Sequence, residues 1–188
     1  MVKAVQTLIS KLDTSSDKSA EQIIAKLVKV GDPAVPELIR AASSSSRPRI
    51  RKWSLQALGA IGNKAAAPLL IESLKDDRMT VKLHAIRGLA RMDHKPAANA
   101  IKRLLTDESG GIRVNAIDAL KKLKARSSGR AILTAIDDKQ WYVRQGAANA
   151  LGELEIKAAI PKLKKLIETE TRKAVLTAAQ DALSKLTT

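Results

Sequence analysis

Apolar residues recur along the chain at intervals of three and four positions, and the whole pattern returns every 31 residues. In the stretch that begins at Gln140, Val143, Ala147, Leu151 and Leu154 are spaced four, four and three positions apart. This spacing places them on one face of an α-helix. Runs with the same spacing begin at four other apolar positions, Ile50, Val81, Ile112 and Val175. Successive runs start 31 residues apart, except the last, which starts after 32. The sequence therefore contains an internal repeat.

Each repeat contains a second helical stretch before the recurrent one. These first helices carry proline or alanine early and leucine later, and they begin at Asp32, Asn63, Lys95, Ser128 and Lys157. A single unit of this length cannot bury its own apolar face, so the units must stack. We therefore predict an all-α fold, an α-solenoid of about six stacked antiparallel helix pairs in one domain, 1–188. The predicted divisions are a capping pair at 1–31, repeats at 32–62, 63–93, 94–125 and 126–156, and a C-terminal capping repeat at 157–188.

The N-terminal pair has its own boundary signals. An amphipathic helix is expected over residues 2–12. Ser19 followed by Gln22 resembles a capping box that opens the next helix, and Gly31 is expected to end that helix.

The turn between the two helices of a repeat carries an acidic residue six positions before a basic one. The pairs are Asp76 with Lys82, Asp107 with Arg113, and Asp138 with Arg144. We expect each acid to cap the second helix and each base to reach the acid of a neighbouring repeat, so that a ladder of ion pairs runs along the stack. Glu170 is followed six residues later by Leu176, and it is therefore expected to lack a basic partner.

The recurrent pattern D-x5-[RK]-x2-[SA]-x2-A-L-G-x-[IL] is clearest in residues 142–154 and 50–62. It resembles the HEAT-like repeats of the phycobilisome-lyase type, over residues 19–188. The resemblance implies a right-handed α-solenoid whose second helices line the concave side. The third copy departs from the pattern with Lys121, Lys122 and Lys124, where a longer helix or a local change in curvature is expected.

Composition narrows the classes of function. The chain has 34 Lys and Arg against 19 Asp and Glu, a formal charge of +15, which favours an anionic partner. Nucleic acid, an acidic protein and an anionic membrane surface all fit, and so does a role in solubility alone. The absence of cysteine excludes disulfides, thiolate metal sites and a cysteine nucleophile. No signal peptide or membrane-spanning run is recognisable, so we expect a cytoplasmic protein without membrane insertion, with the monomer as the default state.

The residues that point outward from the second helices form a candidate binding face. They are Arg49, Lys52, Trp53, Gln56, Leu83, His84, Arg87, Arg91, Asn115, Trp141, Tyr142, Gln145 and Asn149. All three aromatic residues of the chain fall in this set, and Trp, Tyr and Arg dominate binding hot spots. The alternative is that each tryptophan only covers the joint between neighbouring repeats.

Catalysis finds little support, because His84 and His94 have no neighbours at metal-binding or triad spacing. We predict no catalytic residue, metal or cofactor. The leading hypothesis is a non-enzymatic scaffold or adaptor that holds a protein partner on the concave face, and the positive charge favours an acidic partner. Nucleic-acid binding through the basic surface and the aromatic residues is the alternative. The family resemblance adds a third and less favoured hypothesis, that the protein is a subunit or chaperone-like factor of a chromophore lyase.

Overall fold

The computed structural model describes all residues, 1–188, as helices joined by short turns, without strands. The chain divides into two compact units, Met1–His94 (unit 1) and Lys95–Thr188 (unit 2). The division lies beside the repeat boundary expected between residues 93 and 94.

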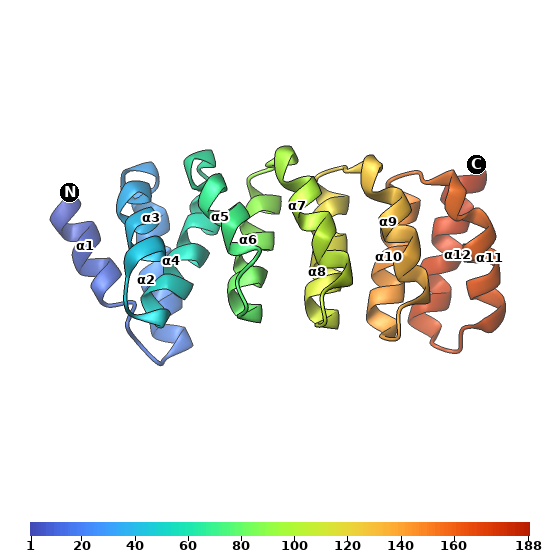
Figure 1. Cartoon of the computed structure of the whole chain (residues 1–188), viewed down its shortest axis with the longest axis horizontal. Helices are drawn as coiled ribbons and strands as arrows, with labels where there is room; N and C mark the ends of the chain where they lie inside the picture. Colours follow the sequence, from blue (N-terminus) through green and yellow to red (C-terminus); the bar gives the residue numbers. More distant parts are fainter. The chain divides into compact units, whose positions relative to one another are not determined.

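Unit 1 holds three antiparallel helix pairs (Figure 1). Its α-helices are α1 (Val2–Ser10), α2 (Asp17–Val30), α3 (Val35–Ser44), α4 (Pro48–Ile61), α5 (Ala67–Ser73) and α6 (Met79–Arg91). Within the unit, α3 packs on α4 and α5 packs on α6, while α4 lies between α2 and α6. The second helices of successive pairs therefore form one layer and the first helices another.

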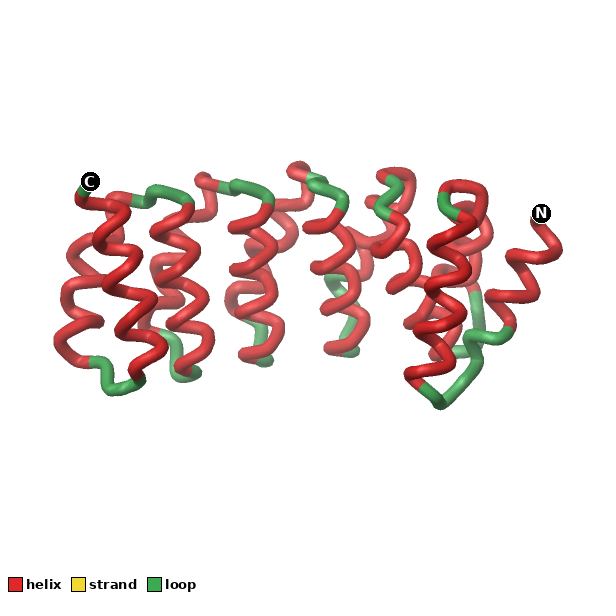
Figure 2. Tube along the Cα trace, turned by 180° about the vertical axis from the view of Figure 1, so that it is seen from behind, coloured by secondary structure: helices red, strands yellow, loops and turns green.

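Unit 2 repeats this arrangement. Its α-helices are α7 (Ala98–Lys102), α8 (Gly110–Lys122), α9 (Gly129–Thr134), α10 (Trp141–Glu153), α11 (Ile160–Thr169) and α12 (Lys173–Thr187). Here α10 lies between α8 and α12, and each first helix packs on the second helix that follows it. Figure 2 shows that the loops in each unit are confined to the helix ends. The fold class is thus the predicted all-α solenoid.

The predicted apolar faces form the core of each unit. The anchor residues Ile50, Val81, Ile112, Val143 and Val175 are all buried. Leu58, Leu89, Leu120 and Leu151 are fully buried eight positions after the anchors of their helices. The helical periodicity of the sequence therefore identified the buried face correctly.

The first helices begin with a turn of 3-10 helix instead of a regular α-helical turn. The opening turns are η1 (Asp32–Ala34), η2 (Lys64–Ala66), η3 (Lys95–Ala97), η5 (Arg126–Ser128) and η7 (Lys157–Ala159). Two first helices also end in one, η4 (Arg103–Thr106) and η6 (Ala135–Asp137). Tighter i→i+3 hydrogen bonds satisfy helix-end groups that have no α-helical partner, so the α-helical parts are shorter than the apolar pattern suggests.

The sequence expectation for the start of α2 is wrong, and of the two alternatives for the third copy the longer helix does not occur. The helix α2 begins at Asp17, and Ser16 is its cap, because the Ser16 hydroxyl accepts a hydrogen bond from the Ser19 backbone N–H at 3.2 Å. The capping box expected from Ser19 and Gln22 does not form. The helix α8 has 13 residues, as α6 and α10 do, so the lysines of the third copy do not lengthen it. Gly31 ends α2, as predicted.

The second helices α4, α6, α8 and α10 are each followed, within two residues, by a residue with positive φ, always twelve positions after the anchor. Gly62 occupies this position after α4, with a φ of 82°. After α6, α8 and α10 the position holds Asp93, Lys124 and Glu155, with φ values of 48°, 53° and 55°. Three L-residues therefore adopt a conformation that glycine adopts without strain.

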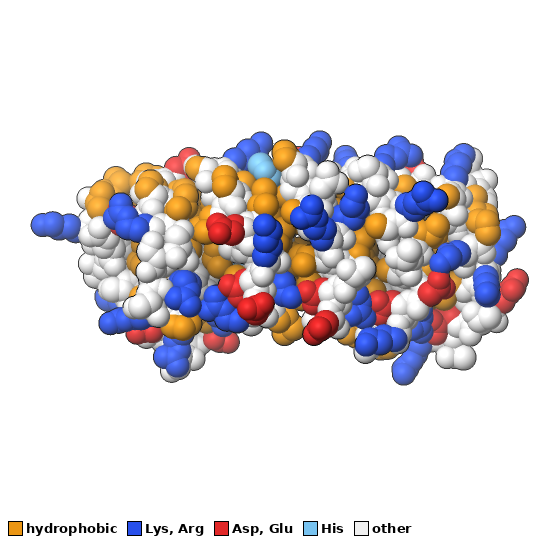
Figure 3. All heavy atoms as spheres, in the orientation of Figure 1, with side chains coloured by type: hydrophobic (Ala, Val, Ile, Leu, Met, Phe, Trp, Pro, Cys, Tyr) orange, Lys and Arg blue, Asp and Glu red, His pale blue; other side chains and the backbone are white.

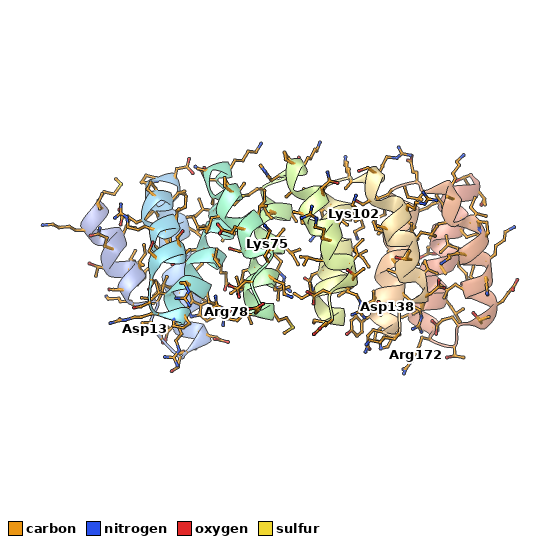
Figure 4. The ribbon with its side chains drawn as sticks, in the orientation of Figure 1. Asp13, Lys75, Arg78, Lys102, Asp138 and Arg172 are labelled. Atoms are coloured by element: carbon orange, nitrogen blue, oxygen red, sulfur yellow. The ribbon has the colours of Figure 1, made fainter.

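The ion-pair ladder is present in unit 2. Arg113 donates from Nε and Nη2 to the two carboxylate oxygens of Asp138, at 2.6 and 2.7 Å. Its Nη1 donates to the carbonyl oxygens of Asp107 and Glu108, at 2.9 and 3.0 Å. Figure 4 shows Asp138 at the turn that joins α9 to α10. Because 8% of the Arg113 side chain and 10% of the Asp138 side chain are exposed, this rung is a buried, bidentate ion pair.

The expectation that Glu170 lacks a partner is wrong. Arg144 donates to the Glu170 carboxylate from Nε at 2.7 Å, and its Nη2 lies 2.6 Å from the same oxygen. The base comes from the preceding repeat, so the last acid of the array is paired although no base follows it. The other carboxylate oxygen of Glu170 accepts the backbone N–H groups of Thr171 and Arg172.

The expectation that these acids cap the second helices is also wrong. Asp76, Asp107 and Asp138 each accept the backbone N–H of the residue two positions later, at 2.8 to 2.9 Å. That residue is the N-cap itself, and none of these helices has a side-chain cap. The acids instead hold the turn that precedes the helix.

Candidate binding face of the second helices

In unit 1 the candidate face is formed by α4 and α6, and its charged residues are all basic. The helix α4 carries Arg49, Arg51 and Lys52, and α6 carries Lys82, Arg87 and Arg91. Neither helix contains an aspartate or a glutamate. The two adjacent helices therefore contain basic residues and no acidic ones.

Two glycines bring the backbones of α4 and α6 together. A Cβ atom added to Gly59 would lie 2.8 Å from Gly88 Cα, and one added to Gly88 would lie 3.0 Å from Gly59 Cα. Only glycine permits this approach, because any side chain would collide with the opposite backbone. The contact leaves the surface hollow at this point.

The hollow has a volume of about 200 Å³. Its lining residues come from both helices and are Gln56, Gly59, Ala60, His84, Arg87, Gly88 and Arg91. Arg87 and Arg91 are exposed, whereas Gln56 and His84 are half-buried. Four residues of the predicted face therefore line one depression.

Trp53 does not present the open aromatic surface that its place on the predicted face suggested. It is only 6% exposed. Its ring lies 6.3 Å from the His84 ring, between centroids, and the Lys52 ammonium lies 3.6 Å from its centroid. Because Trp53 is covered by its neighbours, it joins α4 to α6, as in the alternative reading of the sequence. Its indole N–H is buried without a hydrogen-bond partner.

His84 is uncharged at neutral pH. Burial, together with the positive charges of Lys52 and Arg87, lowers its pKa from 6.5 to about 4. The side-chain oxygen of Gln56 is buried without a hydrogen-bond partner. The hollow thus combines exposed guanidinium groups at its edge with a neutral imidazole and an unused amide oxygen inside.

The remaining predicted residues of unit 1 lie outside this lining. Arg49 is exposed near the start of α4, and Leu83 is half-buried on α6.

In unit 2 the aromatic pair lies at the start of α10. Trp141 is 39% exposed, and its ring meets the Tyr142 ring edge-to-face, with centroids 5.8 Å apart. Tyr142 is half-buried, and a Cβ atom added to Gly110 would lie 2.5 Å from its hydroxyl oxygen. Tyr142 therefore packs over the start of α8, whereas Trp141 keeps an accessible ring.

The other predicted residues of unit 2, Asn115, Gln145 and Asn149, are half-buried. The Asn115 amide donates to the Gly111 carbonyl oxygen at 2.8 Å. This face also carries Asp118 and Glu153, whose carboxylates lie 3.3 and 3.4 Å from the Lys121 ammonium. The second helices of unit 2 are therefore mixed in charge, unlike α4 and α6.

Sequence reasoning missed two features of the unit 1 site. It did not identify Gly59 and Gly88 as the cause of the hollow, nor Lys52 as a cover for Trp53. The sequence did contain a signal for them, because Gly59 and Gly88 both lie inside predicted helices. Glycine in a helix costs about 1 kcal/mol relative to alanine, so its presence there points to a close approach of backbones.

No cluster of three or more His, Asp or Glu side chains has the arrangement needed to hold a metal ion. None of the helices combines the length and the apolar character that crossing a bilayer requires.

Comparisons with known proteins agree with this architecture. A designed armadillo repeat protein is 18% identical, covering 96% of this chain and 98% of its own, with a TM-score of 0.61. Another, in complex with the peptide (KR)4, is 17% identical over 96% of this chain and 98% of its own, with a TM-score of 0.64. The complex of CpcE and CpcF of phycocyanin lyase from Nostoc sp. PCC7120 is 22% identical over 94% of this chain and 75% of that chain, with a TM-score of 0.66. At these identities the likeness shows the fold alone.

A search of curated proteins found no match. The family model of HEAT repeats matches residues 5–81 and 110–184, which is most of the chain. The resemblance inferred from the repeated pattern is thereby confirmed, and the chain belongs to the HEAT repeat family.

Proposed function

We propose that the protein is a non-enzymatic binding scaffold that holds an acidic segment of a protein partner on the face of α4 and α6. One observation carries the proposal: both helices are free of acidic residues, and the bases Arg87 and Arg91 stand at the edge of the hollow between them. Guanidinium groups pair with carboxylates through two parallel hydrogen bonds, and their charge steers an acidic segment toward the site.

The neutral groups inside the hollow fit a peptide backbone. The unused Gln56 oxygen can accept a peptide N–H. Solved proteins of similar fold support a protein partner, since one is bound to a peptide and another is a complex of two chains. The peptide in that first neighbour is basic, whereas the charge of α4 and α6 favours an acidic one.

The test uses a fluorescein-labelled, capped decapeptide of alternating Glu and Ala, with binding measured by fluorescence anisotropy at 150 mM salt. The double variant Arg87→Gln/Arg91→Gln should bind about tenfold more weakly, a loss of about 1.4 kcal/mol. The matched control is Arg103→Gln/Arg130→Gln, which removes the same charge from exposed positions of unit 2 and should change the affinity less than about twofold. Equal losses in the two variants would show that net charge, and not this face, binds the peptide.

Nucleic acid remains the competing ligand, and the accessible ring of Trp141 is the observation that favours it. Single-stranded nucleic acid binds through bases stacked on aromatic side chains, at about 1 to 3 kcal/mol per stacked base. A capped oligothymidine of ten nucleotides, added in the same assay, should quench Trp141 fluorescence if this reading holds. Loss of that affinity in Trp141→Ala, together with no binding of the acidic peptide, would replace the scaffold proposal.

A further inference from the structure

A second pocket in unit 1 lies away from the hollow, between the two helix pairs α3–α4 and α5–α6. It has a volume of about 460 Å³ and is lined by residues of all four helices and of the α5–α6 turn. Its charged lining residues are Arg51, Glu72, Lys75, Asp76 and Arg78. Leu55, Leu69 and Val81 supply an apolar wall. Figure 4 shows Lys75 and Arg78 on either side of the turn that joins α5 to α6.

Arg51 occupies the position that carries the ladder arginines in unit 2. It follows the anchor Ile50 directly, as Arg113 follows Ile112 and Arg144 follows Val143. Its Nη1 donates to the Ser45 carbonyl oxygen, in the turn before α4, as Arg113 donates to the Asp107 carbonyl oxygen before α8. The guanidinium is therefore oriented by the backbone in the same way in both units.

The carboxylate that should complete this rung is held elsewhere. Asp76 follows Arg51 by 25 residues, the same interval that separates Asp138 from Arg113. Asp76 instead accepts hydrogen bonds from Arg78 Nε and Nη2, at 2.8 and 2.7 Å. The corresponding position in the next copies of the turn holds Ser109 and Gln140, which cannot form such a pair. Arg51 consequently forms no ion pair of its own, although its charge contributes to lowering the pKa of Asp76. Lys75 forms no ion pair either.

We propose that this pocket binds a carboxylate ligand, with the Arg51 guanidinium taking the place toward it that Arg113 takes toward Asp138. Asp76 is paired with Arg78, so the other charged lining residues are the bases Arg51 and Lys75 and the exposed acid Glu72. The volume exceeds that of one carboxylate, and the wall of Leu55, Leu69 and Val81 suits a short aliphatic stem. The ligand class is therefore an aliphatic carboxylate, either a small acid or a glutamate side chain of a peptide.

The experiment titrates the intact protein with glutarate and with the capped tripeptide Ala-Glu-Ala, and follows the Arg Nε–Hε signals by NMR. Glutaramide and the Ala-Gln-Ala tripeptide are neutral isosteres, and sodium chloride is matched for ionic strength. We expect a saturable shift of the Arg51 signal with the carboxylates and none with the isosteres. If only glutarate binds, the ligand is a small acid, and if only the tripeptide binds, it is a glutamate side chain of a peptide. Either result, or binding of both, supports the proposal that the pocket binds a carboxylate.

Two variants and a matched control make the result specific. Arg51→Gln should weaken carboxylate binding at least tenfold, and Arg51→Lys should weaken it about threefold or more, because lysine keeps the charge without the fork. Arg130→Gln, exposed on α9 and without an acidic partner, removes the same charge and should bind as the parent does. A linear Arg51 shift, equal losses in Arg51→Gln and Arg130→Gln, or saturable shifts at Arg87 and Arg91 instead of Arg51 would overturn the proposal. That last result would leave the function proposed for α4 and α6 intact, so the two ideas fail separately.

Discussion

At the scale of single residues, the left-handed helix ends show a strain that can be relieved. Lys124 has a φ of 53° after α8, where an L-residue costs about 1 to 2 kcal/mol relative to glycine. Glycine loses more entropy on folding, about 0.5 to 1 kcal/mol, so Lys124→Gly should raise the free energy of unfolding by about 0.5 to 1 kcal/mol. Urea denaturation followed by circular dichroism measures this change.

The reverse substitution, glycine to alanine at an equivalent position, provides the control for Lys124→Gly. Gly62 has the same role after α4, and a Cβ atom there would meet nothing within 4 Å. Gly62→Ala should therefore lower stability by about 1 kcal/mol through backbone strain alone. If Lys124→Gly is destabilising while Gly62→Ala is neutral, the positive φ values carry no energetic cost.

His84 makes the free energy of unfolding depend on pH between about 6.5 and 4. The folded pKa of about 4 lies below the ordinary value of 6.5, so the unfolded chain binds the proton more readily than the folded one. This contribution to stability is therefore complete above about pH 6.5 and is lost as the pH falls toward 4. An NMR titration of the His84 imidazole should show a midpoint near 4, and His84→Gln should flatten the unfolding free energy between pH 6.5 and 4.5. A midpoint near 6.5 would mean that the ring is open to water.

At the scale of helices and their contacts, the buried rung between Arg113 and Asp138 should matter more than surface pairs. Burial works to raise the pKa of Asp138, but hydrogen bonds from Arg113 and from the Gln140 backbone outweigh it, and the pKa is lowered overall. Asp138→Ala would leave the Arg113 guanidinium buried without a counter-charge, which costs about 3 to 5 kcal/mol. Thermal and urea unfolding both measure this loss.

The matched comparison is the exposed pair Arg126 and Glu155, whose side chains are 63% and 67% exposed. Arg126→Ala should cost less than about 1 kcal/mol, because water screens the pair. Glu170→Ala should behave like Asp138→Ala, since only 4% of the Glu170 side chain is exposed and Arg144 holds it. A small loss at Glu170 would show that the last rung does not stabilise the C-terminal pair.

The close contact between α4 and α6 at Gly59 and Gly88 leads to a further prediction. Gly59→Ala would place a Cβ atom 2.8 Å from the backbone of α6, so the two helices would have to separate, at about 1 to 3 kcal/mol. Gly111→Ala is the control, because its nearest neighbour is the Ser109 hydroxyl at 3.5 Å. That change should be neutral or stabilise α8 by up to about 1 kcal/mol. Similar effects at both sites would mean that the glycine contact does not set the spacing of α4 and α6.

The helices were largely predictable from the sequence, and their contacts were less so. A repeated apolar face fixes which side of each second helix is buried, so the anchors and leucines were assigned correctly. Ion-pair partners depend on which repeat supplies the base, and spacing within one repeat could not show that Arg144 reaches Glu170. The burial of Trp53 depends on where Lys52 and His84 come to lie, which periodicity does not specify.

At the scale of the whole molecule, the excess of positive charge is shared by both units. Residues 1–94 contain 16 Lys and Arg against 9 Asp and Glu, and residues 95–188 contain 18 against 10. On the face that Figure 3 shows, basic side chains are scattered over each unit, and acidic ones lie among them, mostly on the side where first helices turn into second helices. The two units therefore do not differ in total charge. They differ in its arrangement, because α4 and α6 of unit 1 carry only basic charged residues.

This separation predicts how two anionic ligands will differ. Duplex DNA responds to total charge, and its affinity should fall linearly with the logarithm of salt concentration, with a slope near −0.9 for each phosphate contacted. Because Arg87→Gln/Arg91→Gln and Arg103→Gln/Arg130→Gln each remove two charges, both should weaken DNA binding by similar factors and reduce the slope similarly. The acidic decapeptide should distinguish the two variants at the same salt concentrations. If DNA affinity at 150 mM salt instead depended on Arg87 and Arg91 alone, the face of α4 and α6 would be a nucleic-acid site, and the acidic protein partner would be the wrong assignment.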